Sequence, residues 1–354
     1  MAPAGASDEP CQVARSGSFR HDGTGRGLQG ARVSELQRFL FDGVPVRGAL
    51  VRLTNDWREV LARRGGANAY PAPVRSLLGE MAAASVLMQA SLRFEGALVL
   101  QVFGDGPVKL AVAEVQHDLA FRVTANVAGA VAADAQLEAL LNVHGGGRCA
   151  ITLDPQGRQP GQQPYQGVVP LHGDRREPLQ KLSQVLEHYM LQSEQLDTRL
   201  VLAADDATAA GLLIQRMPVS GAANLAGERN EDRIGKDEDY KRIAMLAATL
   251  TSDELLTLPS DTLLRRLFWE ESLRRFAPRP GEPAPHFACS CSRERVGRML
   301  LGLGAAEVGE IIAEQGRVEI GCEFCGLRYH FDRVDVGGLF TPAGAQLPGS
   351  AALH

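Results

Sequence analysis

Residues 289–291 read Cys-Ser-Cys and residues 322–325 read Cys-Glu-Phe-Cys, with thirty residues between the two pairs. Two close thiol pairs that bracket a small folded segment can supply four thiolates to one tetrahedral ion, and such sites usually hold Zn²⁺. The first pair has one residue between its cysteines, whereas structural zinc sites usually have two to four. The sequence therefore predicts one zinc ion bound by Cys289, Cys291, Cys322 and Cys325. The tight first pair also points to a second chemistry of the same sulfurs.

The segment around the two pairs, residues 284–334, has the pattern of a small fold, and we call it the cysteine module. It contains a helix capped by Ser292, a second helix over 305–315, and two short strands flanking the second cysteine pair. About fifty residues is close to the size below which domains usually need a metal or disulfides. His286 and His330 are weaker candidate ligands, since His330 alternates with aromatic residues as a strand residue does.

Length and composition indicate several domains and no membrane segment. The 354-residue chain is long enough for two or three domains, and its 45% apolar residues suffice for a sizeable core. No run approaches eighteen apolar residues, and the N-terminal stretch lacks the apolar region of a secretory signal. We therefore expect a cytoplasmic protein without membrane contact. In that reducing compartment, clustered thiols indicate metal or redox chemistry more often than structural disulfides.

The order of strands and helices predicts an α+β fold with an N-terminal mixed α/β core, because no regular βαβ repeat is present. The clearest element is a hairpin over residues 98–115 that turns at Gly104-Asp-Gly-Pro107. We expect a disordered tail at 1–31, a core domain at 32–227, a charged and helical linker at 228–283, the zinc-binding module at 284–334 and a disordered tail at 335–354.

The linker contains two short helices that are not expected to be stable by themselves. Thr251-Ser-Asp-Glu254 is a capping box before a leucine-rich turn, Pro259 interrupts that turn, and Ser260 can cap a second helix. Each helix is shorter than the ~12–15 residues that hold together in water. We therefore expect the apolar faces of residues 251–276 to pack against a neighbouring domain.

Oxidation of the four cysteines is predicted to unfold the cysteine module. Zinc-bound sulfurs are thiolates, the form that oxidants attack, and each has a partner one or two residues away that can resolve a sulfenic acid into a disulfide. A structural zinc contributes on the order of 10–16 kcal/mol to folding in finger-type units, whereas a short-loop disulfide returns only about 2–3 kcal/mol. The linker helices, which need a docking partner, are the next elements to loosen. The pattern predicts a switch.

Further motifs accompany the cysteines in order along the chain, namely Tyr70-Pro-Ala-Pro73, Leu77-Leu-Gly-Glu80, Gly104-Asp-Gly-Pro107, Gln192-Ser-Glu-Gln195, Glu254-Leu-Leu-Thr-Leu-Pro259 and Cys289-Ser-Cys291-Ser-Arg-Glu-Arg295. Together with Cys322-Glu-Phe-Cys325, they make the chain similar to the bacterial 33-kDa heat-shock protein family, the redox-regulated holdase chaperones. The resemblance covers residues 33–334. So many ordered matches are far more specific than a C-x-C or C-x-x-C motif alone.

The resemblance implies a heat-shock chaperone of the oxidative stress response and not an enzyme, so no catalytic residues are assigned. It implies that the reduced, zinc-bound protein is inactive. Oxidation then forms the disulfides Cys289–Cys291 and Cys322–Cys325, zinc leaves and the linker unfolds. It also implies that the activated protein is a homodimer that binds unfolded or misfolded client proteins without ATP.

Two other functions stay open on the residues alone. A thiol–disulfide oxidoreductase could use Cys322 and Cys325, although no thioredoxin-like βαβ pattern surrounds them. A zinc-dependent nucleic-acid adaptor is disfavoured by charge, since the chain carries −5 and residues 284–334 hold six bases against seven acids. The remaining cysteines have plainer interpretations. Cys11 is an exposed thiol of the tail, and Cys149 is a buried strand residue.

Overall fold

The computed structural model describes residues 34–341 except 67–68, 93, 158–160, 162, 218–229 and 279–280, and residues 230–237 by their backbone alone. The expected N-terminal tail, with Cys11, and most of the expected C-terminal tail lie outside the described residues. The described chain is an α+β structure, as the sequence predicts.

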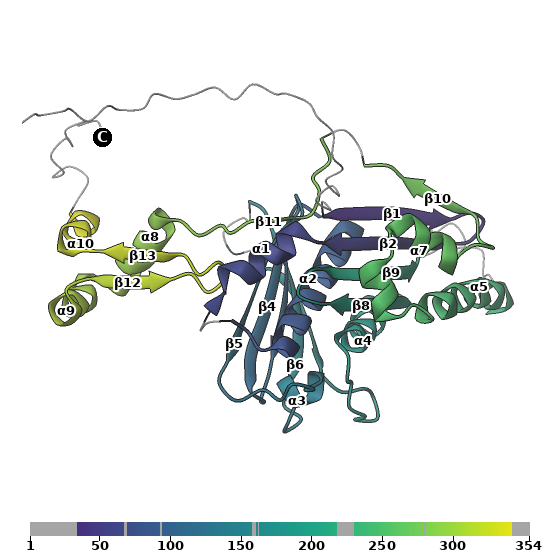
Figure 1. The fold of residues 1–354 in the computed structure, drawn as a ribbon, viewed down its shortest axis with the longest axis horizontal. Helices are drawn as coiled ribbons and strands as arrows, with labels where there is room; N and C mark the ends of the chain where they lie inside the picture. Colours follow the sequence, from purple (N-terminus) through teal and green to yellow (C-terminus); the bar gives the residue numbers. More distant parts are fainter. Residues whose placement is uncertain are drawn as a thin grey trace, which may run out of the picture. The chain divides into compact units, whose positions relative to one another are not determined.

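Two sheets form the core domain (Figure 1). The first has the strand order β10 (Leu273–Phe276), β1 (Glu35–Phe41), β2 (Val46–Leu53), β9 (Ala209–Arg216), β8 (Thr198–Ala204). The second has the order β11 (His286–Phe287), β5 (Ala120–Val127), β4 (Val108–Gln116), β3 (Gly96–Phe103), β6 (Arg148–Pro155), β7 (Tyr165–Pro170). All pairs are antiparallel except β11, which runs parallel to β5. The expected hairpin at 98–115 is confirmed as β3 and β4.

Helix α2 (Ala72–Ser91) packs against strands of both sheets and fills the centre of the core (Figure 1). It is buried along nearly its whole length, so its sequence is apolar on all sides and not only along one stripe. Gly79 permits the close approach, because a Cβ at this position would lie 2.4 Å from Ala204 Cβ. The shorter helices α1 (Asn55–Arg63), α3 (Leu137–Leu141) and α4 (Leu182–Glu194) complete this domain.

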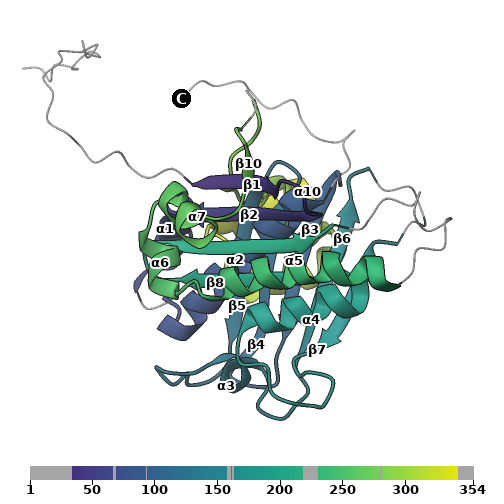
Figure 2. The same ribbon diagram turned by 90° about the vertical axis from the view of Figure 1, so that its right-hand side faces the viewer.

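The linker helices α5 (Asn230–Ala248), α6 (Ser252–Thr257) and α7 (Ser260–Leu267) cover the other side of the first sheet (Figure 2). The predicted capping box is confirmed, since the Thr251 side chain accepts a hydrogen bond from Glu254 N (3.3 Å) and the Glu254 carboxylate accepts one from Thr251 N (3.2 Å). The predicted packing of these helices is confirmed as well. The sheet surface beneath them, which we call the linker face, presents Phe39, Phe41, Val46, Leu50, Leu212 and Ile214.

The end of the linker differs from the expected helix. Residues 273–276 form β10, an edge strand that pairs with β1 in the register Leu273 to Phe41. Helix α7 ends at Leu267 because Phe268 leaves the helical conformation and packs its ring into the linker face. The linker therefore holds on to the core by a strand as well as by helices.

The cysteine module contains α8 (Arg293–Leu303), α9 (Ala305–Gln315) and the two-stranded sheet of β12 (Val318–Gly321) and β13 (Arg328–Phe331). The expected disorder from residue 335 onward is wrong for residues 335–340, which belong to a helix, α10 (Arg333–Phe340). Asp332 caps this helix, and Val336 is buried in the core of the module. The two adjacent glycines in this helix have low helix propensity, so the sequence did not indicate a helix here. In the part of the chain that the structure describes, no helix has the length and apolar character needed to cross a bilayer.

Glu80 is a titratable group inside the core domain. It lies partly buried on α2, beside a cleft of about 900 Å³ whose wall also contains Lys181. Burial raises the pKa of the Glu80 carboxyl to about 8, although the charge of Lys181 opposes this effect. The carboxyl group is therefore protonated at neutral pH in the folded protein.

We expect the substitution Glu80→Gln to stabilise the protein increasingly as the pH rises. Between the ordinary pKa of 4.5 and the folded value of about 8, the folded state holds one proton more than the unfolded state, so wild-type stability falls with pH. E80Q lacks this loss. Its advantage at pH 8.5 over pH 5.5 should be on the order of 1–3 kcal/mol, reduced by solvent in the cleft. Urea unfolding of both reduced proteins at the two pH values measures it. An advantage that does not grow with pH would contradict the assignment.

Candidate metal centre

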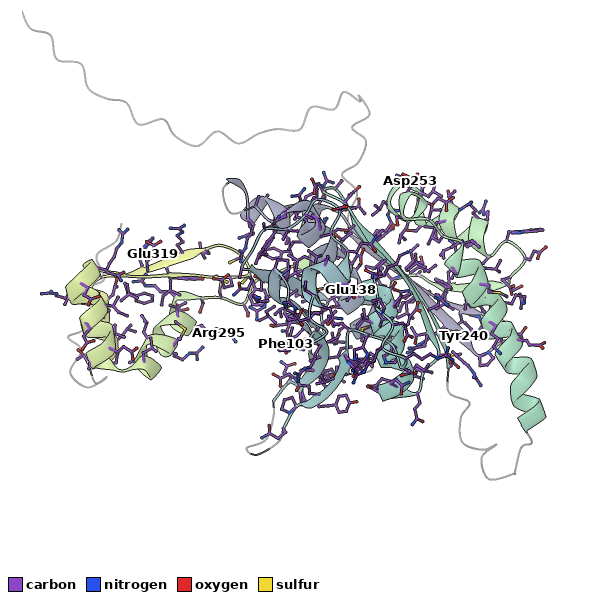
Figure 3. All side chains as sticks on the ribbon, turned by 90° about the horizontal axis from the view of Figure 1, so that it is seen from below. Phe103, Glu138, Tyr240, Asp253, Arg295 and Glu319 are labelled. Carbon is purple, nitrogen blue, oxygen red and sulfur yellow. The ribbon has the colours of Figure 1, made fainter. Side chains whose placement is uncertain are left out.

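The first cysteine pair lies where the chain enters α8. Cys289 and Cys291 precede Ser292, whose hydroxyl caps the helix by accepting a hydrogen bond from Arg295 N (3.2 Å). The Arg295 side chain (Figure 3) turns back and donates to the hydroxyl of Ser290, between the two cysteines (2.9 Å). The helix start and this side chain together fix the direction of the Cys-Ser-Cys segment.

The second pair occupies the turn between β12 and β13. Cys322 N donates to Leu327 O and Gly326 N donates to Cys322 O, both at 2.8 Å. Gly326 has φ +70°, a left-handed conformation that glycine adopts without strain. The Cys322-Glu-Phe-Cys325 segment is therefore a closed knuckle that turns both thiols to one side.

All four predicted ligands come together. Their Sγ atoms lie within 4.8 Å of one another, with 3.6 Å between Cys289 and Cys322 and 3.4 Å between Cys291 and Cys325. Four sulfurs at the usual Zn–S distance around a tetrahedral ion would be about 3.8 Å apart. The four thiols are free, and the two short contacts join one pair to the other. The cluster could therefore hold a metal ion that cross-links the start of α8 to the knuckle.

The chemistry of the donors also fits a cation. Burial raises the pKa of the Cys325 thiol, and its thiol neighbours raise it further. Four thiolates at this spacing repel one another, so a cation is needed to hold them together. The module has only a small apolar core to assist, formed in its described part by Leu300, Val308, Ile312, Val318, Phe331 and Val336. Residues and geometry fit a structural zinc ion.

Two side chains contact the cluster from outside. The Tyr329 hydroxyl donates a hydrogen bond to Cys291 Sγ (3.1 Å), and Arg122 on β5 places Nη1 4.0 Å from Cys289 Sγ. Arg122 also pairs with Glu114 (2.6 Å) and stacks on the Phe324 ring of the knuckle, 4.2 Å from its centroid. Donors of this kind orient the sulfurs and stabilise their negative charge.

The knuckle is held by the core domain as well. Glu323 O accepts hydrogen bonds from Thr124 Oγ1 (2.8 Å) and from the Arg64 guanidinium. Sequence reasoning missed Arg64, Arg122 and Thr124, because they lie about two hundred residues from their partners and no spacing rule connects such positions. An arginine and a threonine in an alternating strand carry no local sign of these contacts.

The two histidines considered as ligands have other partners. His330 Nδ1 lies 3.3 Å from a carboxylate oxygen of Glu319, and His286 Nδ1 lies 3.0 Å from Ala284 O. Among the described residues, the group with metal-binding geometry consists of the four cysteines. Cys149 on β6 is fully buried, as expected, and burial raises the pKa of its thiol to about 12, so it is protonated and unreactive.

The setting of the cysteines weighs against the two alternative functions. In thioredoxin-like proteins the C-x-x-C segment begins a helix, whereas Cys322–Cys325 joins two antiparallel strands. The module carries six bases against seven acids, so its net charge does not attract phosphates. The module therefore favours neither an oxidoreductase nor a nucleic-acid adaptor.

Comparison with known proteins finds one family that matches most of the described chain. The family model described as Hsp33 protein matches residues 34–332. The 33 kDa chaperonin of Chromobacterium violaceum is 47% identical over 306 residues, which are 86% of this chain and 93% of that protein. The 33 kDa chaperonin of Methylobacillus flagellatus is 41% identical over 320 residues, covering 90% of this chain and 98% of the relative.

A solved structure has the same fold. The crystal structure of the 33 kDa chaperonin (heat shock protein 33 homolog) from Thermotoga maritima matches with a TM-score of 0.65 at 21% identity, covering 86% of this chain and 97% of the other. At this identity the likeness concerns the fold alone.

Removal of one cysteine ligand should abolish tight metal binding. We expect the reduced wild-type protein to bind one zinc ion per chain and Cys325→Ser to bind it at least tenfold more weakly, since loss of outer contacts alone costs about 10–100-fold. Cys149→Ala is the matched control, because it removes a buried thiol elsewhere. Competition with a chromogenic chelator measures the affinity. Equal zinc affinity of C325S and wild type would contradict the four-cysteine site.

Proposed function

The chain belongs to the Hsp33 family, so it is a redox-regulated holdase chaperone and not an enzyme, and we propose how its cysteines and linker provide the regulation. The observation that carries the proposal is the linker face. Its apolar side chains are buried under the end of α5 and under α6 and α7, and the last two are helices too short to be stable alone. Regulation then requires only that the linker helices stay docked in one redox state and leave in the other.

In the reduced state, we propose, Cys289, Cys291, Cys322 and Cys325 hold one zinc ion. When bound, the ion supplies the cross-link between α8 and the knuckle and stabilises the four thiolates. Thr124 and Arg64 fix the knuckle through Glu323 O. The folded module in turn keeps the end of the linker in place, because the linker ends at Pro283, six residues before Cys289, and β11 between them pairs with β5 of the core.

Oxidation proceeds within each cysteine pair in this proposal. A thiolate attacks peroxide, becomes a sulfenic acid and releases hydroxide. The second thiol of the pair attacks the sulfenic sulfur, which forms the S–S bond and releases water. Formation of each disulfide thus removes two electrons from a pair of thiols and reduces one peroxide molecule. Formation of Cys289–Cys291 and Cys322–Cys325 removes all four thiolate ligands, so the oxidised module no longer retains zinc.

The loss of the ion destabilises the module far more than the disulfides stabilise it. A structural zinc is worth on the order of 10–16 kcal/mol in small units, and a short-loop disulfide about 2–3 kcal/mol. The module unfolds, the linker loses its anchor, and the linker face becomes accessible. Unfolded clients expose apolar segments, so burial against this face can hold them without ATP.

The remaining partners follow from the same surface. Two copies of a protein with a newly exposed apolar face bury it against each other, so we propose a homodimer as the activated form. The reducing cytoplasm is the compartment in which four free thiols remain available until an oxidant appears, and we propose that location. No nucleic acid or membrane enters the proposal.

Client protection should depend on the oxidation state. The reduced, zinc-loaded protein should not suppress aggregation of a thermally unfolding client, whereas protein treated with peroxide at mildly elevated temperature should. One zinc ion per chain should be released in parallel, and mass spectrometry should find Cys289 linked to Cys291 and Cys322 linked to Cys325. Cys149→Ala should behave as wild type. Equal protection by the reduced form, or zinc retained after full thiol oxidation, would disprove the mechanism.

Activation should also change the mass of the particle. We expect the reduced protein to be a monomer and the oxidised protein a dimer, because exposure of the linker face supplies the surface for association. Light scattering after size exclusion, over a range of protein concentrations, measures both states. An oxidised protein that protects clients as a monomer at all concentrations would rule out the dimer and leave the switch intact.

A further inference from the structure

A buried arginine lies at one end of the linker face, next to the last residue of β2. Arg52 on β2 is 2% exposed, and among the described buried residues it is the one with a formal charge. Side chains alternate along a strand, so Arg52 shares its side of the sheet with Leu50 and Val46, which pack against the linker helices. A guanidinium in such a place is tolerated only where hydrogen-bond acceptors surround it.

The end of α6 supplies these acceptors. Arg52 donates to three backbone carbonyls, from Nη1 to Leu255 O (2.8 Å) and Leu258 O (2.5 Å) and from Nη2 to Leu256 O (2.7 Å). The last carbonyls of a helix have no partners within it. Here Pro259 follows, which has no N–H and ends α6, so these carbonyls need an external donor. A cation also suits the negative end of the helix.

The contact extends across the joint between α6 and α7. Glu35 on β1 lies 4.0 Å from Arg52 Nε, and its carboxylate accepts a hydrogen bond from Ser260 at the start of α7 (2.5 Å). Ser260 follows Pro259 directly. Arg52 and Glu35 therefore bind the chain on both sides of Pro259. The surrounding contacts of the linker face are apolar and do not depend on direction.

We propose that Arg52 is a positioning residue of the switch, which makes the docking of the linker specific and all-or-none; this rests on the proposed function. Docked, the guanidinium is satisfied by three carbonyls. Undocked, both the guanidinium and the carbonyls are hydrated. In between, any shifted or partly lifted arrangement of α6 leaves a buried charge without acceptors, which is strongly unfavourable. Arg52 thereby keeps the reduced linker from opening gradually and exposing the linker face.

The substitution Arg52→Met tests the proposal in the full-length, reduced, zinc-loaded protein. Methionine keeps an apolar side chain of similar length but cannot donate to the carbonyls. We expect trypsin to cleave at Arg265 and Arg266 of α7 at least about tenfold faster than in wild type, with one zinc ion per chain retained. Reduced R52M should also protect clients partially. The matched control is Arg47→Met on the same strand, because Arg47 points to the opposite side of the sheet from Arg52 and, among the described residues, hydrogen-bonds to Gln215 and Ser91 O of the core.

Cleavage of R52M as slow as that of wild type, or slower, would overturn the proposal, as would equally fast cleavage of R47M. If R52M does not fold, Arg52→Lys decides by the same measurement, since it keeps the charge and loses the planar fork, and wild-type cleavage of R52K would overturn the proposal. The cleavage rate is measured without a client. A negative result for the role of Arg52 is thus distinguishable from a negative result for the proposed function, because the proposed function is tested with the oxidised wild-type protein.

Discussion

The apolar linker face determines the behaviour of the molecule, because a sheet with two apolar sides must be covered on both. One side of the five-stranded sheet rests on α2. The other is covered by α5, α6 and α7, and the Phe268 ring lies perpendicular to that of Phe41 at 5.0 Å between centroids. Of these helices, α6 and α7 are too short to persist in water, and the face is too apolar to stay exposed. The short helices are therefore stable only when docked, and the linker face is buried only while they are docked. Weakening the linker anywhere uncovers a continuous apolar surface.

The path from the cysteines to this surface runs through the start of α1. Asp56 accepts hydrogen bonds from Phe287 N (3.0 Å) and from the Ser34 hydroxyl (2.5 Å), and the same hydroxyl accepts one from Thr54 N (3.2 Å). Phe287 lies two residues before Cys289, and Thr54 two residues after Arg52. A stretch of five core residues thus holds both α6 and the segment that leads to the metal centre. In the proposed switch, unfolding of the module would act on this stretch, which connects a change at the cysteines to α6.

The sequence predicts what depends on local spacing. The two cysteine pairs, the capping box at Thr251 and the hairpin around Gly104 follow from residues a few positions apart, and the structure contains the four-cysteine cluster, the capping box and the hairpin. It does not predict Arg52 or Arg122, because an arginine in a strand has the pattern of a solvent-facing residue, and only the tertiary structure brings helix carbonyls or a knuckle to it. Helix α10 was missed for another reason. Its glycines and its position near the chain end resemble a tail, yet Val336 contributes to the core of the module.

The core domain, the linker and the cysteine module differ in how much apolar surface they bury. This difference explains why unfolding can stop at the linker. The core around α2 contains dozens of buried apolar side chains between two sheets and needs no ion, whereas six such side chains form the described core of the module. In the switch that we propose, removal of a metal cross-link would therefore unfold the part with too little apolar burial to compensate for its chain entropy. The linker would follow because α6 and α7 are marginal, and the core would not. A chaperone that is partly unfolded when active requires this ranking of stabilities, and the distribution of apolar residues along the chain provides it.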